Sequence, residues 1–244
     1  MSKIVTLKSD KLKIEVCLTP ALLPLHDLEH SIVVDIDIFR ATSSICYGIE
    51  NGANAIIPVS QVEECAAYHG TDHLLAAERD GEVVEGFDFG NSPFAYTAAK
   101  VAGKTVVLTT TNGTHAIHLS RSAKRIVIGS FLNLSSLAQW LREEHENILL
   151  VCAGWKNNFN LEDTVFAGAV VNQLKNDTYT LDDAAIAAED LYLFAKDDLA
   201  GFLSKSSHSE RLKKLGIEED IAFCLRVDET NAIPVLDGDR LVKL

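Results

Sequence analysis

The sequence contains no closely spaced pair of cysteines, which excludes two kinds of small structural scaffold. Its five cysteines are far apart, and none belongs to a CxxC or CxxH pattern. A structural zinc site or a disulfide framework is therefore not expected. Several cysteines stand in apolar runs, as Cys152 does within 147–154. Because free cysteine is among the residue types most often buried, we expect buried, reduced thiols.

Positive charge is also scarce. The chain has 22 Lys and Arg against 35 Asp and Glu, a formal net charge of −13. Clustered basic side chains bind phosphate backbones and anionic lipids, so neither a nucleic acid nor a membrane surface is an expected partner. No apolar stretch approaches the roughly 18–20 residues that cross a bilayer, and residues 1–10 lack the apolar core of a signal peptide. We therefore expect a cytoplasmic protein.

Three common catalytic and cofactor motifs are missing as well. No GxGxxG follows an expected strand, and neither GxSxG nor GxxxxGK[ST] occurs. Dinucleotide chemistry, nucleophile-elbow hydrolysis and P-loop chemistry are therefore disfavoured. What remains is an ordinary globular composition, with 47 % hydrophobic and 23 % charged residues in a chain of 244. This length allows one large domain or two small ones.

Runs rich in Val and Ile alternate with helical periods along the chain. Strands are expected at 3–8, 12–18, 31–37, 55–60, 74–78, 104–110, 125–130 and 147–154, the first two as an opening hairpin or sheet edge. Helices are expected at about 42–51, 61–69, 93–101, from 114, 134–144, 161–175 and 181–215, before short closing strands. Apolar strands that alternate with helices indicate a three-layer α/β/α fold with a largely parallel or mixed sheet. No linker divides residues 1–244, so we expect one compact unit or two α/β lobes that meet near residues 100–105.

Polar residues gather at four places where an expected strand ends. In open α/β sheets, ligands bind beyond the carboxyl ends of the strands, so these junctions form the candidate site. The first junction, 33–44, carries Asp35, Asp37, Arg40, Thr42 and Ser43. Carboxylates suit Mg²⁺, and hydroxyls at a helix start suit a phosphate. Alternatively, the hydroxyls only cap the helix and the arginine pairs with an aspartate.

The second junction, 76–93, begins with Glu78 and Arg79 directly after an apolar run. It continues through a Gly-rich loop to Asn91, Ser92 and Pro93. Proline fits the first position of a helix, with the preceding serine as its cap. This segment is either an ordinary surface loop or, given an acid and an arginine at a strand end, the wall of a crevice.

The third junction, 106–116, links strand to helix through threonines and the turn Asn112, Gly113 and Thr114. This segment is either a plain Asn-Gly turn or a small anion-binding nest. His115 and His118 follow and are candidate proton donors, with a solvated helical histidine as the alternative.

The fourth junction, 149–171, holds Lys156 in an Asn-rich loop and an acidic pair at a helix start. Asn160 and Asp163 resemble a capping pair, which leaves Glu162 without a structural role. Small residues that would allow close packing of this helix on a strand follow at Ala167 and Gly168. Together the four junctions supply the groups of a Mg²⁺-assisted phosphoryl site, in which acids hold the metal and cations neutralise phosphate oxygens.

At these residues the chain resembles the 2-phosphosulfolactate phosphatase (ComB) family, the Mg²⁺-dependent phosphatases of coenzyme M biosynthesis. The resemblance covers nearly the whole chain and rests on DIDIFRATSS, ERDGEVVEGFDFGNSP, TTTNGT, CAG with LEDTVFAG, and LGIEEDIAFCLRVDETNAIPVL. It implies an α/β/α fold with two related lobes. It also implies a phosphoric monoester hydrolase that converts 2-phospho-3-sulfolactate, or a related 2-hydroxy-acid phosphate, to 3-sulfolactate and phosphate.

The family motifs carry over to named positions of this sequence. They fall on Asp37, Arg40, Ala41 and Thr42, on Glu78 and Arg79, on Gly90, Asn91, Ser92 and Pro93, on Asn112, Gly113 and Thr114, and on Glu162 and Asp163. The loop WKNNFN and the segment SSHSERL (206–212) are less typical. Contact between them and the acid's tail would bear on specificity for sulfolactate.

The residues and the resemblance lead to one hypothesis for the site. A substrate with about four negative charges needs a local cationic pocket in so acidic a chain. Asp37, Glu78 and an acid of the pair Glu162 and Asp163 would hold Mg²⁺, and Arg40 and Arg79 would bind anions. The predicted substrate-binding residues are Thr42, Ser43, Asn91, Ser92, Asn112, Gly113, Thr114 and Lys156. Attack by an aspartate and attack by a metal-bound water both stay open.

Two other functions fit parts of the sequence. A haloacid-dehalogenase-type phosphatase would use Asp35 and Asp37 as its DxD pair, although Phe39 stands where Thr or Val is expected. A non-catalytic sensor of a phosphorylated metabolite would use the same crevice. A homo-oligomer is compatible with the sequence, which leaves the oligomeric state open.

Overall fold

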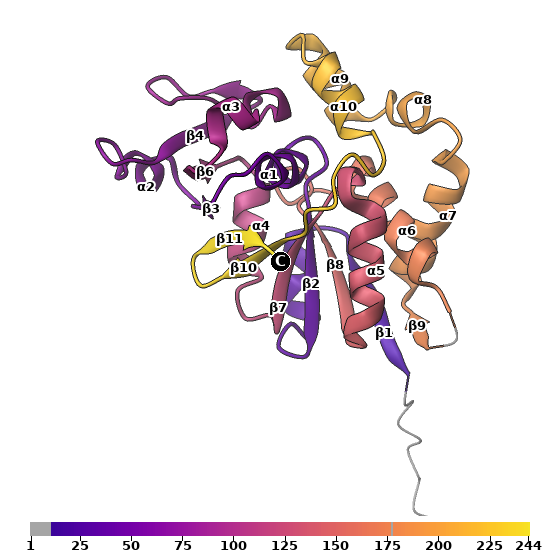
Figure 1. Ribbon diagram of the computed structural model, residues 1–244. Coiled ribbons are helices and arrows are strands. Elements are labelled where there is room, and N and C mark those ends of the chain that lie inside the picture. Colours follow the sequence, from indigo (N-terminus) through magenta and orange to yellow (C-terminus); the bar gives the residue numbers. More distant parts are fainter. Residues whose placement is uncertain (1–10, 177) are drawn as a thin grey trace, which may run out of the picture.

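The computed structural model describes residues 11–176 and 178–244, and at their centre lies a mixed sheet of 11 strands (Figure 1). The strand order is β5-β4-β6-β3-β11-β10-β7-β2-β8-β1-β9. The α/β class with a mixed sheet is thus confirmed. The strands are β1 (Leu12–Cys17), β2 (Ser31–Ile36), β3 (Ala55–Pro58), β4 (Leu74–Arg79), β5 (Glu82–Val83), β6 (Thr105–Thr109), β7 (Arg125–Gly129), β8 (Asn147–Cys152), β9 (Tyr179–Leu181), β10 (Pro234–Asp237) and β11 (Arg240–Lys243).

Ten α-helices and three 3₁₀ helices accompany these strands in the described ranges. The α-helices are α1 (Ala41–Glu50), α2 (Val62–Ala66), α3 (Ala98–Val101), α4 (Gly113–Leu119), α5 (Leu134–Glu144), α6 (Leu161–Leu174), α7 (Asp183–Ala195), α8 (Leu199–Leu203), α9 (Ser207–Lys214) and α10 (Glu218–Cys224). The 3₁₀ helices are η1 (Pro20–Leu25), η2 (Pro93–Ala95) and η3 (Phe131–Asn133). Among the helices described, none combines the length and the apolar character that a membrane crossing requires.

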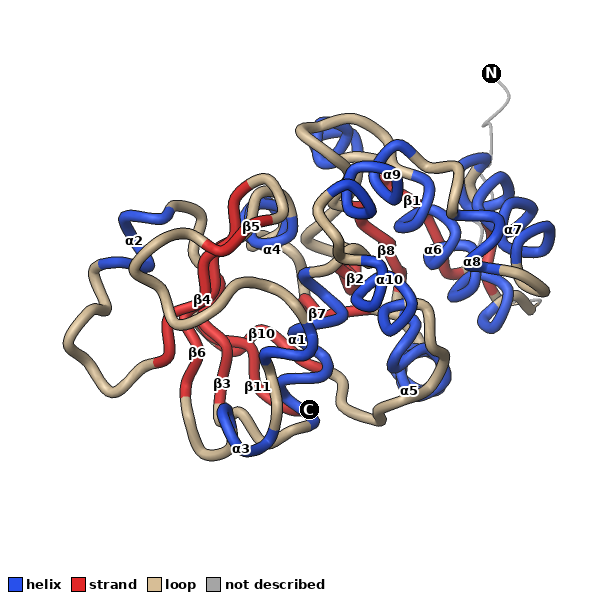
Figure 2. Tube along the Cα trace, turned by 90° about the horizontal axis from the view of Figure 1, so that it is seen from above, coloured by secondary structure: helices blue, strands red, loops and turns tan. Residues whose placement is uncertain are grey.

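The sheet consists of two groups of parallel strands joined by an antiparallel hairpin. The strands β7, β2, β8, β1 and β9 form one parallel group, and β3, β6 and β4 form the other. The hairpin β10–β11 pairs antiparallel with β7 on one side and with β3 on the other. Figure 2 shows the two groups on opposite sides of this hairpin and of α1. The chain changes group between β2 and β3 and returns between β6 and β7; the division of lobes near residues 100–105 stays a prediction.

Helices cover both faces of the sheet because successive strand residues point to opposite sides. In β2, Ile32 packs into the cluster under α5 and α6, whereas Val33 packs into the cluster beside η1. In β3, Ile56 joins the cluster that contains residues of α1, and Ile57 joins the cluster that contains Cys65 of α2. The strand ends that carry the polar junctions are therefore held by apolar layers on both sides.

Three expected elements differ from the structure. Strand β1 lies between β8 and β9 and is parallel to both, so it is neither a sheet edge nor the partner of a hairpin within the described residues. The strand expected at 3–8 lies outside the described residues. The helix expected at 93–101 is instead the short η2 followed by the single turn of α3.

The segment expected to be helical at 181–215 is confirmed as helical, and three local caps divide it into separate helices. Asp182, Asp198 and Ser206 each accept a hydrogen bond from a backbone N–H three residues later, at 2.7, 2.8 and 3.0 Å. Such side-chain oxygens start a new helix by satisfying its first free amides. The three caps thus start α7, α8 and α9, and the last of these helices reaches the candidate site.

Gly168 allows two helices to pack closely, rather than a helix and a strand as expected. A Cβ placed on Gly168 of α6 would lie 1.9 Å from the backbone oxygen of Ala188 in α7. Because backbone atoms of a packed helix cannot move as a side chain can, only glycine fits this position.

Replacing Gly168 by alanine should lower the free energy of unfolding by about 2 kcal/mol or more. Overpacking of a tight interior typically costs about 1–3 kcal/mol, which exceeds the helix propensity that alanine gains. Urea unfolding followed by circular dichroism measures the difference. A change below about 0.5 kcal/mol would show that α7 moves aside freely, contrary to the close backbone approach.

Candidate active site

The four polar junctions meet around one small cavity. Its walls come from the loops after β2, β4, β6 and β8, from the loop before η2, and from α9. Parallel strands of both groups therefore contribute their carboxyl ends to it, as the α/β architecture predicts. The lining residues are Asp37, Phe39, Arg40, Glu78, Gly81, Asn91, Asn112, Trp155, His208, Arg211 and Leu212.

Asp37 follows β2 and lies at the centre of this arrangement. Its side chain lies over Gly113, where an added Cβ would be 2.7 Å from its Oδ2 atom. Its backbone N–H donates to Oγ1 of Thr42 at 3.1 Å, which fixes the start of α1. The pKa of Asp37 is raised to about 6, chiefly by burial; His208 acts against the shift, and Glu78 and Glu162 contribute to it. The carboxyl group is thus withdrawn from water and surrounded by other charged groups.

Glu78 and Asn91 complete the oxygen-rich wall. The carboxylate of Glu78 accepts hydrogen bonds from the backbone N–H of Gly81 and, at 3.3 Å, from that of Thr111. Asn91 is 5 % exposed, and its Oδ1 atom is buried without a hydrogen-bond partner in the described part of the chain. Buried amide oxygens are normally paired, so this one indicates a missing ligand.

Arg40 also lines the cavity, but its charge is already engaged. Its guanidinium donates to the carboxylate of Asp220 in α10 and, at 3.0 Å, to the backbone oxygen of Gly81. Both side chains of the ion pair are buried. The pair holds α10 against the loop after β2, and the rest of the guanidinium faces the cavity.

Arg79 and Lys156 do not line the cavity, unlike Arg40, the third predicted cationic side chain. The guanidinium of Arg79 donates to the backbone oxygen of Glu78 at 2.7 Å and to Oγ1 of Thr109 at 3.0 Å. Lys156 points outward to Asp80 at 3.3 Å, and its backbone N–H donates to Oδ1 of Asn112 at 3.0 Å. Both residues lie near strand ends, as predicted. Their side chains, however, contact groups outside the cavity.

Asp163 is also turned away from the cavity. Its Oδ1 accepts from the backbone N–H of Ile38 at 2.9 Å, and its Oδ2 accepts from that of Gly154 at 3.1 Å. Burial raises its pKa well above the usual range. It therefore joins the loop after β2 to the loop after β8, whereas Asn160, its expected capping partner, makes no side-chain cap.

Glu162 contacts the cavity through His208. Nδ1 of His208 and Oε1 of Glu162 are 2.6 Å apart, and both side chains are almost fully buried. The second carboxylate oxygen, Oε2, is buried without a partner in the described residues. Glu162 thus orients the histidine ring, whose other side faces the cavity with Asp37.

The predicted hydroxyl ligands mostly stabilise the loops. Ser43 donates to the backbone oxygen of Ile38 at 3.0 Å, and Thr114 donates to that of Thr110 at 3.3 Å. Ser92 precedes η2, but its side chain makes no capping hydrogen bond. Of the predicted substrate-binding set, only Asn91 and Asn112 are among the residues that line the cavity.

The lining residues that were not predicted as site residues include Trp155, His208 and Arg211. They belong to WKNNFN and SSHSERL, the two segments that looked untypical. Trp155 lies 5.6 Å from the His208 ring and, centroid to guanidinium carbon, 3.3 Å from Arg211. The spacing of histidine and arginine three residues apart, which share a helix face, was the available signal.

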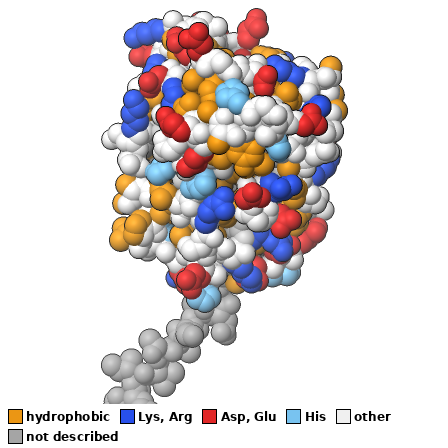
Figure 3. Space-filling view, turned by 90° about the vertical axis from the view of Figure 1, so that its left-hand side faces the viewer, with side chains coloured by type: hydrophobic (Ala, Val, Ile, Leu, Met, Phe, Trp, Pro, Cys, Tyr) orange, Lys and Arg blue, Asp and Glu red, His pale blue; other side chains and the backbone are white. Residues whose placement is uncertain are grey.

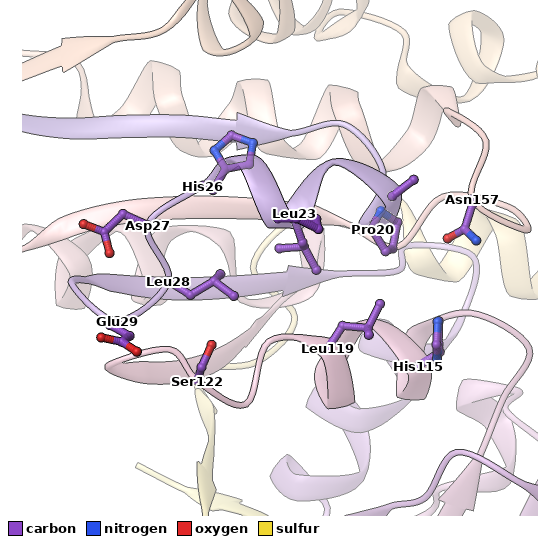
Figure 4. A pocket seen from close by; sticks show the side chains of 12 residues that line it. Pro20, Leu23, His26, Asp27, Leu28, Glu29, His115, Leu119, Ser122 and Asn157 are labelled. Atoms are coloured by element: carbon purple, nitrogen blue, oxygen red, sulfur yellow. The ribbon is translucent and has the colours of Figure 1, made fainter.

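The two histidines predicted as candidate proton donors, His115 and His118, do not line this cavity. His118 is hydrogen-bonded through Nε2 to the backbone oxygen of Pro58 at 3.0 Å. His115 lines a separate groove of about 550 Å³ between η1 and α4 (Figure 4). None of the predicted acids lines that groove.

Asp35 contradicts the haloacid-dehalogenase interpretation. Its side chain is 0 % exposed, and neither oxygen has a hydrogen-bond partner in the described residues. Burial raises the pKa of this carboxyl group well above its usual range, and the nearby Asp37 adds to the shift. Asp35 does not line the cavity and cannot meet a phosphoester there as a nucleophile.

The cavity contains a partial ligand set for a divalent cation. No group of three or more His, Cys, Asp and Glu side chains in the described ranges has a geometry for a metal ion. Asp37 and Glu78 nevertheless face one cavity, together with the unpartnered Oδ1 of Asn91. Mg²⁺ is commonly held by one or two carboxylates, with water and substrate phosphate as further ligands. The donor set fits such an ion.

The basic side chains that line the cavity, within the described residues, are the arginines Arg40 and Arg211 and the histidine His208. On the face shown in Figure 3, Lys and Arg side chains alternate with Asp and Glu. The positive charge available to a ligand in the cavity therefore comes from the individually placed Arg40 and Arg211.

Comparisons with known proteins agree over most of the chain. Residues 17–239 match the family model described as 2-phosphosulpholactate phosphatase. A protein of Thermotoga petrophila is 43 % identical over 87 % of this chain and 92 % of its own length. One of Caldanaerobacter subterraneus is 40 % identical over 86 % and 89 %, and one of Gloeobacter violaceus is 38 % identical over 91 % and 94 %. Each is named as a probable 2-phosphosulfolactate phosphatase.

The raised pKa of Asp37 leads to a pH-dependent effect on stability. The protonated carboxyl stabilises the fold below the pKa of the unfolded chain, and this contribution is lost as the pH rises through about 6. Asp37→Asn, which stays neutral, should therefore raise the free energy of unfolding by about 1–3 kcal/mol at pH 8 and change it little at pH 4.

Urea unfolding in EDTA at the two pH values measures this difference. Asp72→Asn, at a side chain that is 97 % exposed, is the matched control and should show no such dependence. A difference between Asp37→Asn and the parent protein that is the same at both pH values would contradict the raised pKa.

Proposed function

The chain belongs to the 2-phosphosulpholactate phosphatase family, and we propose that it hydrolyses the phosphate ester of 2-phospho-3-sulfolactate in a Mg²⁺-dependent reaction. The products are 3-sulfolactate and phosphate. The observation that carries this proposal is the convergence of Asp37, Glu78, Arg40 and Arg211 on one cavity. The names of the relatives supply the substrate.

Asp37 and Glu78, with Oδ1 of Asn91, would hold the Mg²⁺ ion. When bound, the ion neutralises phosphate oxygens and thereby stabilises the charge that develops during transfer. Its charge also favours the ionised form of Asp37, which burial alone disfavours. Glu162 and Asp163 fit this role less well, because their oxygens face His208 and two backbone amides.

Arg40 would bind the phosphoryl group. Its ion pair with Asp220 and its bond to Gly81 hold the guanidinium in one orientation at the cavity wall. A guanidinium fixed in this way can offer its remaining N–H groups to phosphate oxygens without reorganisation.

His208 would donate the proton that the leaving group needs. In hydrolysis, a water oxygen adds to phosphorus, the bond from phosphorus to the 2-oxygen breaks, and that oxygen takes up a proton. Glu162 binds Nδ1 of His208, which leaves Nε2 for the cavity side. A carboxylate bonded to one ring nitrogen holds the imidazole ring in one orientation.

The first test is phosphate release from 2-phosphosulfolactate with Mg²⁺ and with EDTA. Asp37→Asn and Glu78→Gln should each lower kcat by at least about 100-fold, because each removes the negative charge of a carboxylate that would hold the ion. Glu63→Gln, at an exposed position of α2, is the matched control and should retain full activity.

Phospholactate and phosphoglycerate extend the same assay to related 2-hydroxy-acid phosphates. Turnover that survives EDTA would refute the metal dependence, and near-normal rates in both variants would refute the site. Binding of the phosphoesters without any turnover would instead favour the sensor.

The second test separates proton donation from structural support. His208→Asn should lower kcat on the alkyl ester 2-phosphosulfolactate by about 100-fold or more, as loss of a general acid typically does. The rate on p-nitrophenyl phosphate should change by less than about fivefold, because nitrophenolate leaves without a proton. Glu162→Gln should show the same pattern with a smaller loss. Equal losses on both substrates would mean that His208 only supports the fold.

A further inference from the structure

Arg211 is a guanidinium in the cavity that has no polar partner there. It lies on α9, lines the cavity, and makes no hydrogen bond or ion pair with the described residues. Its Nε atom is buried and unpartnered. Buried donors are normally paired, and an unpaired buried N–H costs free energy. The group is therefore placed for an acceptor that is not part of the protein.

Trp155 holds this guanidinium by stacking. The guanidinium carbon of Arg211 lies 3.3 Å from the centroid of the Trp155 ring, within cation–π distance. Nζ of Lys156 lies 5.0 Å from the same centroid. Stacking fixes the plane of the guanidinium and leaves its N–H edge for hydrogen bonds, because the ring contacts the face and not the edge.

The other two arginines at these junctions are already bonded within the protein. Arg40 donates to Asp220 and Gly81, and Arg79 donates to Glu78 and Thr109. Burial lowers the pKa of Arg211, but nearby carboxylates, first Glu162 and then Glu78, favour its charged form. Arg211 is thus the guanidinium of the cavity whose hydrogen-bonding capacity is unused.

The position of Arg211 indicates which part of a substrate it would meet. Asp37 and Arg40 belong to the loop after β2, and Glu78 lies at the end of β4. Arg211 belongs to α9, and Trp155 belongs to the loop after β8. Two separate cationic positions in one cavity match a ligand with two separate anionic groups. A phosphoryl group at the first position leaves a second oxyanion for Arg211.

We propose that Arg211, stacked on Trp155, binds the terminal oxyanion of the substrate's acid tail, and so selects 2-hydroxy-acid phosphates over phosphoesters without a charged tail. This inference rests on the proposed function and goes beyond it by assigning the specificity. A carboxylate and a sulfonate both present oxygens that a guanidinium fork can bind. Removal of the guanidinium should therefore weaken binding of the tail and leave the phosphoryl chemistry intact.

Steady-state kinetics of Arg211→Gln and Arg211→Lys on three substrates test the assignment. The substrates are 2-phosphosulfolactate, 2-phospholactate, which lacks the sulfonate, and glycerol 2-phosphate, which lacks both acids. We expect Arg211→Gln to raise KM for 2-phosphosulfolactate by about 10–100-fold with kcat changed less than threefold. Its effect on glycerol 2-phosphate should stay below twofold. Arg211→Lys should be intermediate, since it keeps the charge and loses the fork.

The phospholactate arm distinguishes the two oxyanions. A large KM effect on 2-phosphosulfolactate with little effect on phospholactate assigns Arg211 to the sulfonate, and similar effects on both assign it to the carboxylate. Lys213→Gln removes a charge from an exposed position of the same helix and should leave all three substrates unaffected. Equal losses on all three substrates for Arg211→Gln, or no loss on any, would overturn the proposal.

A binding measurement keeps the test independent of turnover. In a Trp140→Phe background, Trp155 is the remaining tryptophan, and 3-sulfolactate should change its fluorescence. Arg211→Gln should weaken this binding at least tenfold, and equal binding with and without Arg211 would refute the subsite. If no phosphoester is hydrolysed but 3-sulfolactate binding depends on Arg211, the subsite stands and the proposed function fails. If 2-phosphosulfolactate is hydrolysed equally well with and without Arg211, the proposed function stands and the subsite fails.

Discussion

A carboxyl group withdrawn from water at the end of β2 is the constraint on which the site depends. The fold holds Asp37 where burial raises its pKa to about 6, so its charged form is unfavourable without a partner. Gly113 leaves space for the carboxyl group, and Asp163 fixes the backbone beyond it. A cation beside Asp37 would offset the cost of burying its charged form. Burial of the ionised carboxyl group, which lowers the stability of the fold, would therefore favour the binding of a metal ion beside it.

The architecture explains how so acidic a chain can receive an anionic ligand. Two groups of parallel strands direct their polar loops to one cavity, and α9 completes the wall with His208 and Arg211. The helix caps at Asp182, Asp198 and Ser206 set the path by which the chain reaches that position. The net charge of −13 does not prevent an anion from binding in the cavity, because a few guanidinium groups there act on it at short range.

The features of the fold and of the site that could be predicted from the sequence follow from local patterns. Apolar strands alternating with helices gave the α/β class, and strand-end polarity identified Asp37, Glu78, Asn91 and Asn112. Side-chain direction was not predictable in this way, since Arg79 turns to a threonine of the neighbouring strand. The contribution of Arg211 could not be predicted either, because α9 contacts Trp155 only in the folded protein. Local periodicity contains no information about such distant contacts.

The central claim is that Asp37 and Glu78, which are far apart in the sequence, hold one divalent cation together. The most direct test is an anomalous difference map from crystals grown with Mn²⁺, which replaces Mg²⁺ and scatters X-rays anomalously. We expect one strong peak within coordination distance of both carboxylates and of the Asn91 amide oxygen. A peak at Glu162 and Asp163 alone, or no peak in this cavity at saturating Mn²⁺, would contradict it.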